Sequence, residues 1–313
     1  MFSKYDYVYM VYKEGSFTKA AEKLYISQPS LSAAIKNIEK KLGASIFERT
    51  GHGIELTEVG KEYIVATERI IEIENEFKNK LNDIYNLESG HIRVGGSNYL
   101  SSYVLPQIIN RFTSLHPNIS VTLVEANSCS LSKMAMEGEV DIFLENLEDV
   151  TDFEEFPLVR EKVLLCVPKE SKINCGLEKY QILPESIHNN QIDLENVGSV
   201  SIDVFRNEKF ILLKNGNDMY TRAMKIFEKK NIEPKVAFSV DQLNMSYALA
   251  DSGIGICFVT DTFFKYGKYH ENVVLYNITE ELKRRTLYIA YKRNKYCSKA
   301  MKEFINVAKE VIN

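Results

Sequence analysis

The stretch Gly15–Gly60 reads GSFTKAAEKLYISQPSLSAAIKNIEKKLGASIFERTGHGIELTEVG. Ser16 stands before apolar residues at helical spacing and predicts an N-cap, because its hydroxyl can pair an otherwise unpaired amide of the first turn. Ser27 predicts a second N-cap, with Pro29 in the first turn, where a missing N–H costs nothing. Gly43 predicts the end of that helix, since glycine readily takes the left-handed conformation. We therefore expect two short helices separated by a tight turn.

Two helices joined by so short a turn pack at a steep angle, which leaves the second one free to enter the DNA major groove. The small pair Ala20-Ala21 allows a close approach, and Leu31, Ile35 and Ile38 give the second helix an apolar stripe. The opposite face carries short polar side chains and one cation, which suit base edges and phosphates. The residues expected in the groove are Gln28, Ser30, Ser32, Ala33 and Lys36.

A hairpin is predicted to follow the two helices. The segment Phe47–Leu56 has two glycines near its middle, which is typical of a tight β-turn between two short strands. Arg49 and His52 would then reach a phosphate or the minor groove from this wing. The region as a whole predicts a winged helix-turn-helix domain over residues 1–58.

This region resembles the DNA-binding head of LysR-type transcriptional regulators. The resemblance rests on residues at fixed offsets, namely Gly15-Ser16-Phe17, Ala20-Ala21, Leu24, Ser27-Gln28-Pro29, Leu31-Ser32, Ile35, Glu39, Leu42-Gly43, Phe47, Arg49, Leu56-Thr57 and Gly60. It implies promoter DNA as a partner, with RNA polymerase as a further one, and a dimer of dimers. The DNA-binding residues so predicted are Thr18, Ser27, Gln28, Pro29, Ser30, Ser32, Ala33, Lys36, Arg49 and His52.

The charge balance of the chain shows how it would bind DNA. The net charge is −4 over 313 residues, a length that predicts two or more domains. Residues 1–60 hold eight Lys and Arg against seven Asp and Glu, a net charge of +1. DNA affinity must then come from the placement of charge and from several heads binding together. No apolar run is long enough to span a bilayer, so we expect a cytoplasmic protein that does not bind membranes.

The cysteine spacing and the catalytic motifs of known enzymes bear on other possible functions. The five cysteines show neither a Cys-x-x-Cys pair nor a Cys/His metal spacing, which predicts reduced thiols, no metal and no cofactor. Cys166 lies in an apolar run and predicts a buried strand residue, and a redox switch with Cys175 is the alternative. No nucleophile elbow or phosphate-binding loop is present, so we expect no enzyme activity.

A long helix is predicted after the head. No proline occurs between Glu58 and Glu88, and Thr57 is placed to cap the start. The apolar residues Tyr63, Ile70, Phe77 and Ile84 fall seven apart, with Ala66, Ile73 and Leu81 between them. This heptad-like stripe predicts a linker over residues 59–89 that pairs with the same helix of a second subunit. Packing on its own domain is the alternative.

The remainder, residues 90–313, alternates strand and helix patterns, which predicts parallel sheets with crossover helices. We expect an α/β effector domain of two Rossmann-like lobes, resembling periplasmic binding proteins, preceded by an all-α winged helix-turn-helix and a long linker helix. Lobe I is assigned to residues 90–161 and 267–313, because the last strand and helix are expected to rejoin it. Lobe II is assigned to residues 162–266, in which residues 178–201 show no clear pattern.

A ligand site is expected between the lobes. Ligands of such sheets bind beyond the carboxyl ends of the strands, near helix N-termini. Hydroxyls and amides there suit an anionic effector, whereas Glu145 and Asp241 leave open an amine group on the ligand. The predicted effector residues are Ser97, Asn98, Tyr99, Asn127, Ser128, Cys129, Glu145, Asn146, Lys214, Asn215 and Gln242.

Taken together, these features predict a DNA-binding transcriptional regulator of the LysR type, controlled by a small-molecule effector. The alternative is a solute-binding protein with no DNA role, which would use the two lobes and not the head.

Overall fold

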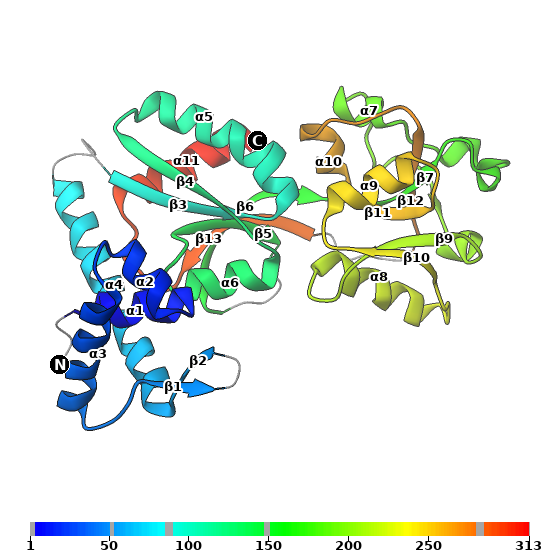
Figure 1. Cartoon of the computed structure of the whole chain (residues 1–313). Helices are drawn as coiled ribbons and strands as arrows, with labels where there is room; N and C mark the ends of the chain where they lie inside the picture. The colour runs from blue at the N-terminus through cyan, green and yellow to red at the C-terminus, as the bar shows by residue number, and fades with distance from the viewer. Residues whose placement is uncertain (1–3, 51–52, 85–89, 147–150, 280–284, 313) are drawn as a thin grey trace. The chain divides into compact units, whose positions relative to one another are not determined.

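The computed structural model describes residues 4–50, 53–84, 90–146, 151–279 and 285–312 (Figure 1). The chain divides into two compact units, residues 1–80 and 81–313. We refer to the first unit as the head and to the second as the effector domain.

The described part of the head follows the predicted pattern. Its elements are α1 Tyr5–Glu14, α2 Phe17–Lys23, α3 Gln28–Leu42, β1 Phe47–Thr50, β2 Gly53–Leu56 and most of α4 Glu58–Ile84. The hydroxyls of Ser16 and Ser27 accept hydrogen bonds from the amides of Lys19 and Ser30, which confirms both N-caps. Gly43 ends α3 in the left-handed conformation, with φ +76°. The hairpin β1–β2 is antiparallel, as a wing requires.

The core of the head joins all of its helices. Ala20 and Ala21 are buried where α2 meets α3, and Leu31 and Ile35 of α3 pack in the same cluster. The first turns of α4 complete this core, since Tyr63 is 4% exposed. The alternative that α4 packs on its own domain therefore holds for its first turns.

Gly60 lies at the closest approach between α4 and the segment before the wing. A methyl group added at Gly60 would lie 2.1 Å from the carbonyl oxygen of Ile46. The same carbonyl accepts a hydrogen bond from the amide of Thr57, and the Thr57 hydroxyl accepts one from the amide of Gly60. Thr57 thus caps α4 as predicted, and only glycine fits at position 60 without moving the backbone.

Lobe I is built on a sheet with strand order β4-β3-β5-β13-β6. Its elements are β3 Gly90–Gly96, η1 Leu100–Val104, α5 Leu105–Leu115, β4 Ile119–Glu125, α6 Ser128–Met136, β5 Ile142–Asn146, β6 Phe153–Glu161, β13 Arg285–Lys292 and α11 Lys299–Ile312. Strands β4, β3 and β5 are parallel, whereas β13 runs antiparallel to β5 and β6. Helices α5 and α11 cover one face of the sheet, and α6 covers the other (Figure 1).

Lobe II is built on a sheet with strand order β10-β9-β11-β7-β12-β8. Its elements are β7 Val163–Pro168, η2 Lys172–Asn174, η3 Glu178–Tyr180, α7 Pro184–His188, β8 Ser199–Val200, η4 Ile202–Phe205, β9 Lys209–Leu213, α8 Asp218–Lys229, β10 Lys235–Val240, α9 Leu243–Asp251, β11 Ile256–Thr260, α10 Asp261–Tyr266 and β12 Val273–Ile278. Strand β7 is antiparallel to β11 and to β12, so both lobes have mixed sheets where parallel ones were predicted.

Strand β12 corrects the predicted boundary between the lobes. It pairs with β7 in lobe II, whereas residues 267–313 were assigned to lobe I. The chain therefore returns to lobe I between β12 and β13, and lobe II extends to residue 279. The sequence does not predict β12 or β6. An apolar run such as β12 can pair in either lobe, and β6 is an edge strand that carries charges and Pro157.

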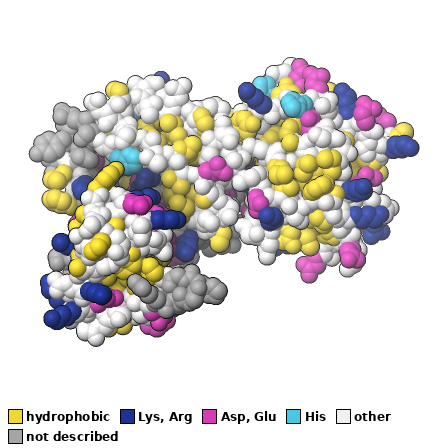
Figure 2. Space-filling view, viewed as in Figure 1, with side chains coloured by type: hydrophobic (Ala, Val, Ile, Leu, Met, Phe, Trp, Pro, Cys, Tyr) yellow, Lys and Arg dark blue, Asp and Glu magenta, His cyan; other side chains and the backbone are white. Residues whose placement is uncertain are grey.

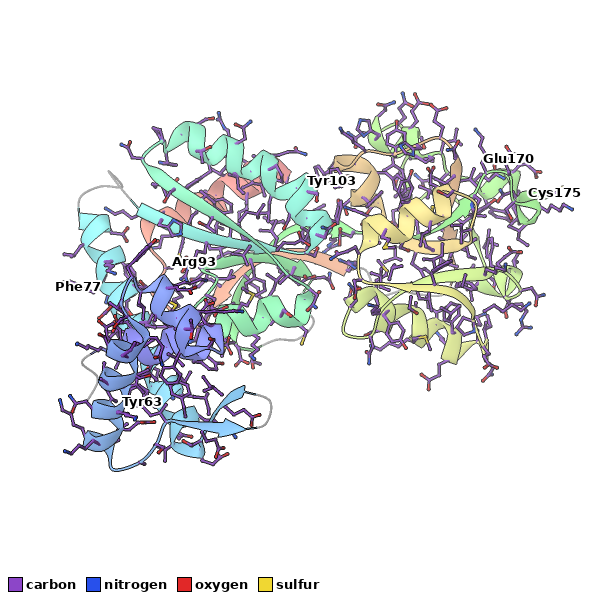
Figure 3. The ribbon with its side chains drawn as sticks, in the orientation of Figure 1. Tyr63, Phe77, Arg93, Tyr103, Glu170 and Cys175 are labelled. Atoms are coloured by element: carbon purple, nitrogen blue, oxygen red, sulfur yellow. The ribbon has the colours of Figure 1, made fainter. Side chains whose placement is uncertain are left out.

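The buried cysteine prediction is confirmed. Cys166 lies on β7 with no exposed surface, and its partner in the antiparallel register is Cys257 of β11. Cys175 is exposed (Figure 3). All five cysteines are free thiols in the structure.

The end of α4 is held by the effector domain. The carboxylate of Asp83 accepts hydrogen bonds from the Tyr296 hydroxyl, at 2.7 Å, and from the amide of Lys299, at 3.0 Å. Lys299 also donates from Nζ to the backbone carbonyl of Asp83. Because Lys299 is the first residue of α11, Asp83 places a negative charge where the helix dipole favours one.

We expect Gly60→Ala to destabilise the head by about 2 kcal/mol or more, because the added methyl group forces α4 away from Ile46. Circular dichroism melting of the full chain should show a lower transition for the head. Gly90→Ala is the matched control, since the nearest atom would lie 3.9 Å from its methyl group. Equal melting curves for the two variants would contradict this account.

Candidate functional site

The outer face of α3 is available to a partner. Ser30, Ala33 and Lys36 are exposed, whereas Leu31 and Ile35 on the other side are buried in the head. Figure 2 shows lysine and arginine side chains on this part of the head. Thr18, Ser27 and Pro29 are also exposed, and Gln28 and Ser32 are half-buried. The predicted groove residues on α3 are therefore all at least partly exposed.

Hydrogen bonds within α3 orient this face. The amide nitrogen Nε2 of Gln28 donates to the hydroxyl of Ser32 at 2.8 Å, and the hydroxyls of Ser27 and Ser30 lie 2.7 Å apart. These bonds restrain the side chains of Gln28, Ser30 and Ser32 near the start of the helix. Bonds to bases would replace or extend the bonds within the helix.

The wing is fixed to the body of the head at its base. The ring of Phe47 packs edge-on against Phe17 of α2, with centroids 5.7 Å apart. Glu39 of α3 accepts a hydrogen bond from the amide of Ile46 at 2.8 Å. Arg49 lies on β1 opposite Ile54, and its side chain is outside the described residues, as is all of His52. Their predicted DNA contacts stay predictions.

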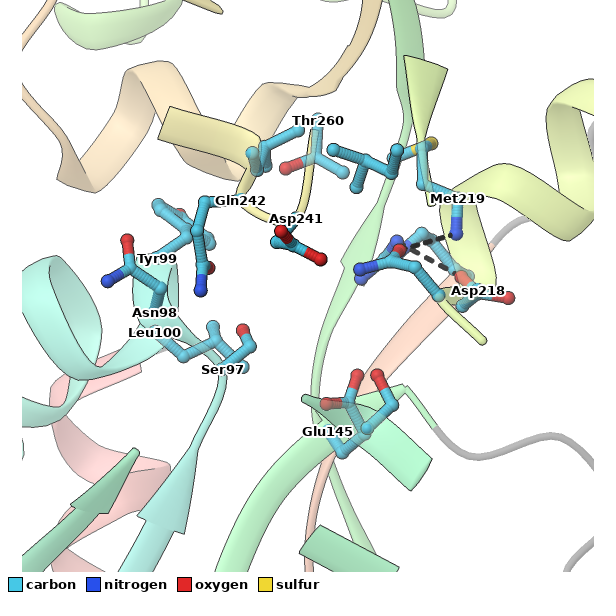
Figure 4. A pocket seen from close by; sticks show the side chains of 15 residues that line it. Ser97, Asn98, Tyr99, Leu100, Glu145, Asp218, Met219, Asp241, Gln242 and Thr260 are labelled. Atoms are coloured by element: carbon cyan, nitrogen blue, oxygen red, sulfur yellow. Dashed lines mark hydrogen bonds and ion pairs between the residues drawn. The ribbon is translucent and has the colours of Figure 1, made fainter. Parts of the chain in front are cut away.

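A pocket lies between the lobes at the carboxyl ends of the strands, where one was predicted (Figure 4). It contains about 500 Å³ of empty space, including its open mouth. Helices α6, α8 and α9 present their first residues to it. Its lining consists of Ser97, Asn98, Tyr99, Leu100, Ser128, Glu145, Leu213, Asn217, Asp218, Met219, Asp241, Gln242, Leu243, Thr260 and Arg285.

Ion pairs join the lobes on one side of the pocket. Arg285 of β13 donates from Nε to Glu161 at 2.7 Å and from Nη1 to Asp218 of α8 at 3.1 Å. Arg222 of α8 binds Asp218 at 2.9 Å and reaches Asn146 of lobe I. Burial acts to lower the pKa of Arg285, but Glu161 and Asp218 outweigh burial and raise this pKa. The guanidinium is therefore charged at every physiological pH.

Neutral contacts join the lobes on the other side. Asn244 of α9 donates to the side-chain oxygen of Asn98 at 2.9 Å. The ring of Tyr99 packs on Phe263 of α10, with centroids 5.4 Å apart, and Tyr103 (Figure 3) packs near the same ring. The Tyr99 hydroxyl is buried without a hydrogen-bond partner, and burial raises the pKa of Tyr99 well above its usual value.

Glu145 is a buried carboxylate at the end of β5. Its Oε1 accepts a hydrogen bond from the amide of Asn146 at 2.9 Å, and its Oε2 has no hydrogen-bond partner. Burial raises the pKa of Glu145, while the Asn146 amide, Arg285 and Ser128 act to lower it. The pKa of Glu145 is raised overall, so the effect of burial outweighs the effects of Asn146, Arg285 and Ser128.

The predicted effector residues divide into two groups. Ser97, Asn98, Tyr99, Ser128, Glu145 and Gln242 line the pocket. The others do not line it, and most have another role in the structure. Asn127 caps α6, Asn146 bonds the carbonyl of Thr286, and Lys214 pairs with Asp241 at 2.7 Å. Asn215 binds the amide of the next residue, and Cys129 is exposed.

Some lining residues were not predicted from the sequence. Asn217 stands directly before α8 and Asp218 lies in its first turn. This capping pattern could have identified both residues as lining the pocket at a helix N-terminus. Arg285 belongs to a basic run, and no local pattern separates it from its neighbours. Leu100, Leu213, Met219 and Leu243 give the pocket apolar walls that sequence reasoning did not assign.

The described residues form neither a metal-ligand cluster nor a membrane-spanning helix. None of their His, Cys, Asp and Glu side chains forms a group that could hold a metal ion. None of their helices is both long and apolar enough to cross a membrane.

Comparison with known proteins bears on both sites. Two family models match, "Bacterial regulatory helix-turn-helix protein, lysR family" over residues 2–61 and "LysR substrate binding domain" over residues 86–313. The "Uncharacterized HTH-type transcriptional regulator YcgK" of Bacillus subtilis (strain 168) is 28% identical over 307 residues. That match covers 97% of this chain and 93% of the relative.

Solved structures show the same fold. Full-length CbnR complexed with its target DNA has a TM-score of 0.66 and 16% identity, with 99% of each chain covered. The effector binding domain of QuiR in complex with shikimate has a TM-score of 0.56 and 19% identity. It covers 72% of this chain and 97% of that one.

A winged helix-turn-helix head followed by a two-lobed domain with a pocket defines a ligand-controlled transcriptional regulator. The chain belongs to the LysR family of DNA-binding transcriptional regulators. The family consists of regulators and not of enzymes, and nothing supports a solute-binding protein without a DNA role. The resemblance noted in the sequence is confirmed.

We expect Arg285→Gln to destabilise the effector domain by about 3–5 kcal/mol, because Glu161 is left buried without its cation. Chemical denaturation of the full chain measures this change. Arg293→Gln is the matched control, since its pair with Glu154 is half exposed and should contribute about 0.5 kcal/mol or less. A similar loss in both variants would show that the buried pair has no special role.

Proposed function

We propose that the protein binds promoter DNA with α3 in the major groove and the wing against the backbone or minor groove. The main observation that supports this proposal is the exposed polar face of α3. The apolar face of the same helix is buried in the core of the head, so the polar face is the one that can meet DNA. The residues proposed to contact DNA are Thr18, Ser27, Gln28, Pro29, Ser30, Ser32, Ala33, Lys36, Arg49 and His52.

The protein acts in this proposal as a dimer of dimers, with α4 as the first interface. Beyond its first turns α4 exposes a stripe of large apolar side chains: Ile73 is 66% exposed and Phe77 (Figure 3) 61%. An exposed apolar stripe on a long helix is stabilised by a second copy of itself. Several heads on one DNA also compensate for the small positive charge of each.

A small molecule bound between the lobes controls the regulator in this proposal. A ligand that contacts both lobes favours one arrangement of the two lobes. In the assembled regulator, that arrangement favours one spacing of the heads on DNA. The residues proposed to form the site are those of the pocket lining. The change on DNA alters the access of RNA polymerase in the cytoplasm, where promoter DNA is found.

We expect Ser32→Glu to abolish operator binding while the head stays folded, because a carboxylate in the groove repels phosphates and cannot donate the hydrogen bonds that a serine hydroxyl can. A gel shift with the DNA upstream of the gene measures binding, and circular dichroism checks the fold. Asn207→Glu adds the same charge to the effector domain, at an exposed position, and should bind DNA normally. Unchanged affinity of Ser32→Glu would count against the groove assignment.

We expect Phe77→Glu to give monomers, because each subunit would bury a glutamate without a cation in the proposed α4 seam. Light scattering coupled to size exclusion measures the mass. Phe77→Leu keeps the apolar surface and should remain a dimer or larger. A dimeric mass for Phe77→Glu would reject this helix as the interface.

A further inference from the structure

Glu145 lines the pocket and has a carboxylate oxygen, Oε2, for which the described residues show no hydrogen bond, although the nearby Ser128 acts to lower the pKa of this carboxyl. The residue is 4% exposed, and its Oε2 is buried without a hydrogen-bond partner. Figure 4 shows the carboxylate pointing toward the middle of the pocket. Leaving a buried carboxylate oxygen without a partner is costly, so such an atom in a pocket indicates a group that completes it.

The other charged groups of the lining are already paired. Asp218 is bound by Arg222 and Arg285, and Arg285 is shared with Glu161. Asp241, also a lining residue, pairs with Lys214 at 2.7 Å. Glu145 is thus the one carboxylate among these lining residues for which the structure shows no ion pair.

The charge of the lining disfavours a simple anion. Asp218, Asp241 and Glu161 are matched by the cations Arg222, Arg285 and Lys214, so the negative charge of Glu145 is the one that these pairs leave unbalanced. At short range in a partly buried site, like charges repel strongly. The helix N-termini led to a sequence-based prediction of an anionic effector, with an amine group on the ligand as the open alternative. The charge of the lining favours the amine.

We infer that the effector of this regulator carries a protonated amine, which donates a hydrogen bond to Oε2 of Glu145. The inference rests on the proposed function, in which the pocket is the effector site. An ammonium group has three donors, and Ser97 and Ser128, whose hydroxyls can accept hydrogen bonds, also line the pocket. Leu213, Met219 and Leu243 line the apolar wall that receives the carbon skeleton.

The same residue should lower the stability of the ligand-free protein. Burial raises the pKa of the Glu145 carboxyl, so the folded state binds its proton more tightly than the unfolded state. Stability contributed by this group is then present at low pH and is lost as the pH rises through the folded pKa. Glu145→Gln removes the charge while Oε1 can still accept the Asn146 amide, so its Tm at neutral pH should be a few degrees higher.

The test uses the full chain as wild type, Glu145→Gln and Glu170→Gln. Glu170 is exposed at the other end of lobe II (Figure 3), so its variant makes the same change of charge away from the pocket. Each protein is melted with a set of small primary amines and amino acids, and with carboxylic acids of the same carbon skeletons. A ligand of the folded protein raises Tm by mass action.

We expect amine-bearing compounds to raise the Tm of wild type and Glu170→Gln, and the plain carboxylic acids not to. Glu145→Gln should lose about 10- to 100-fold in affinity for the same amines. Its Tm without ligand should exceed that of wild type at neutral pH, with the difference shrinking in acid.

The inference is overturned if carboxylic acids alone raise the Tm, if no amine does, or if Glu145→Gln retains full affinity for the amines. A gel shift of wild type with the upstream DNA keeps the two proposals apart. If wild type binds no DNA, the proposed function fails, and the melting experiments still report what the pocket binds.

Discussion

The buried guanidinium of Arg285 is the interaction on which the arrangement of the two lobes depends. It stands at the start of β13, where the chain returns to lobe I, and binds Glu161 at the end of β6, where the chain leaves it. Its second bond reaches Asp218 in the first turn of α8 in lobe II. The two points where the chain passes between the lobes and one wall of the pocket therefore all lie at the Arg285 cation. A change in the pocket near Arg285 thus also acts on the connection between the lobes.

The pocket combines this paired network with one unpaired group. Asp218 and Arg285 compensate each other, so they shape the wall without adding free charge. Glu145 has no such partner and costs stability in the ligand-free protein. In the proposed function, a ligand that completes this site recovers that free energy on binding and so favours one arrangement of the lobes.

Helix α4 has a different task at each end. Its first turns belong to the core of the head, where Gly60 allows the closest approach to Ile46. Its last turn belongs to the effector domain, where Asp83 caps α11. Ile73 and Phe77, which lie between these ends, are 66% and 61% exposed. This division suits a helix that connects two functional domains and still offers a surface to another copy.

The local features of the fold were predictable from the sequence, because each depends on residues a few positions apart. Ser16, Ser27 and Gly43 mark helix ends through bonds or φ angles of the same turn, and the sequence by itself determined the head and the family. Only the tertiary structure decided that β12 pairs in lobe II, that Arg285 joins the lobes and that Glu145 lies unpaired in the pocket. Strand pairing and ion pairing bring together residues that are far apart in the chain, 67 positions for Arg285 and Asp218 and 124 for Arg285 and Glu161, and no short pattern records which partner each of them finds.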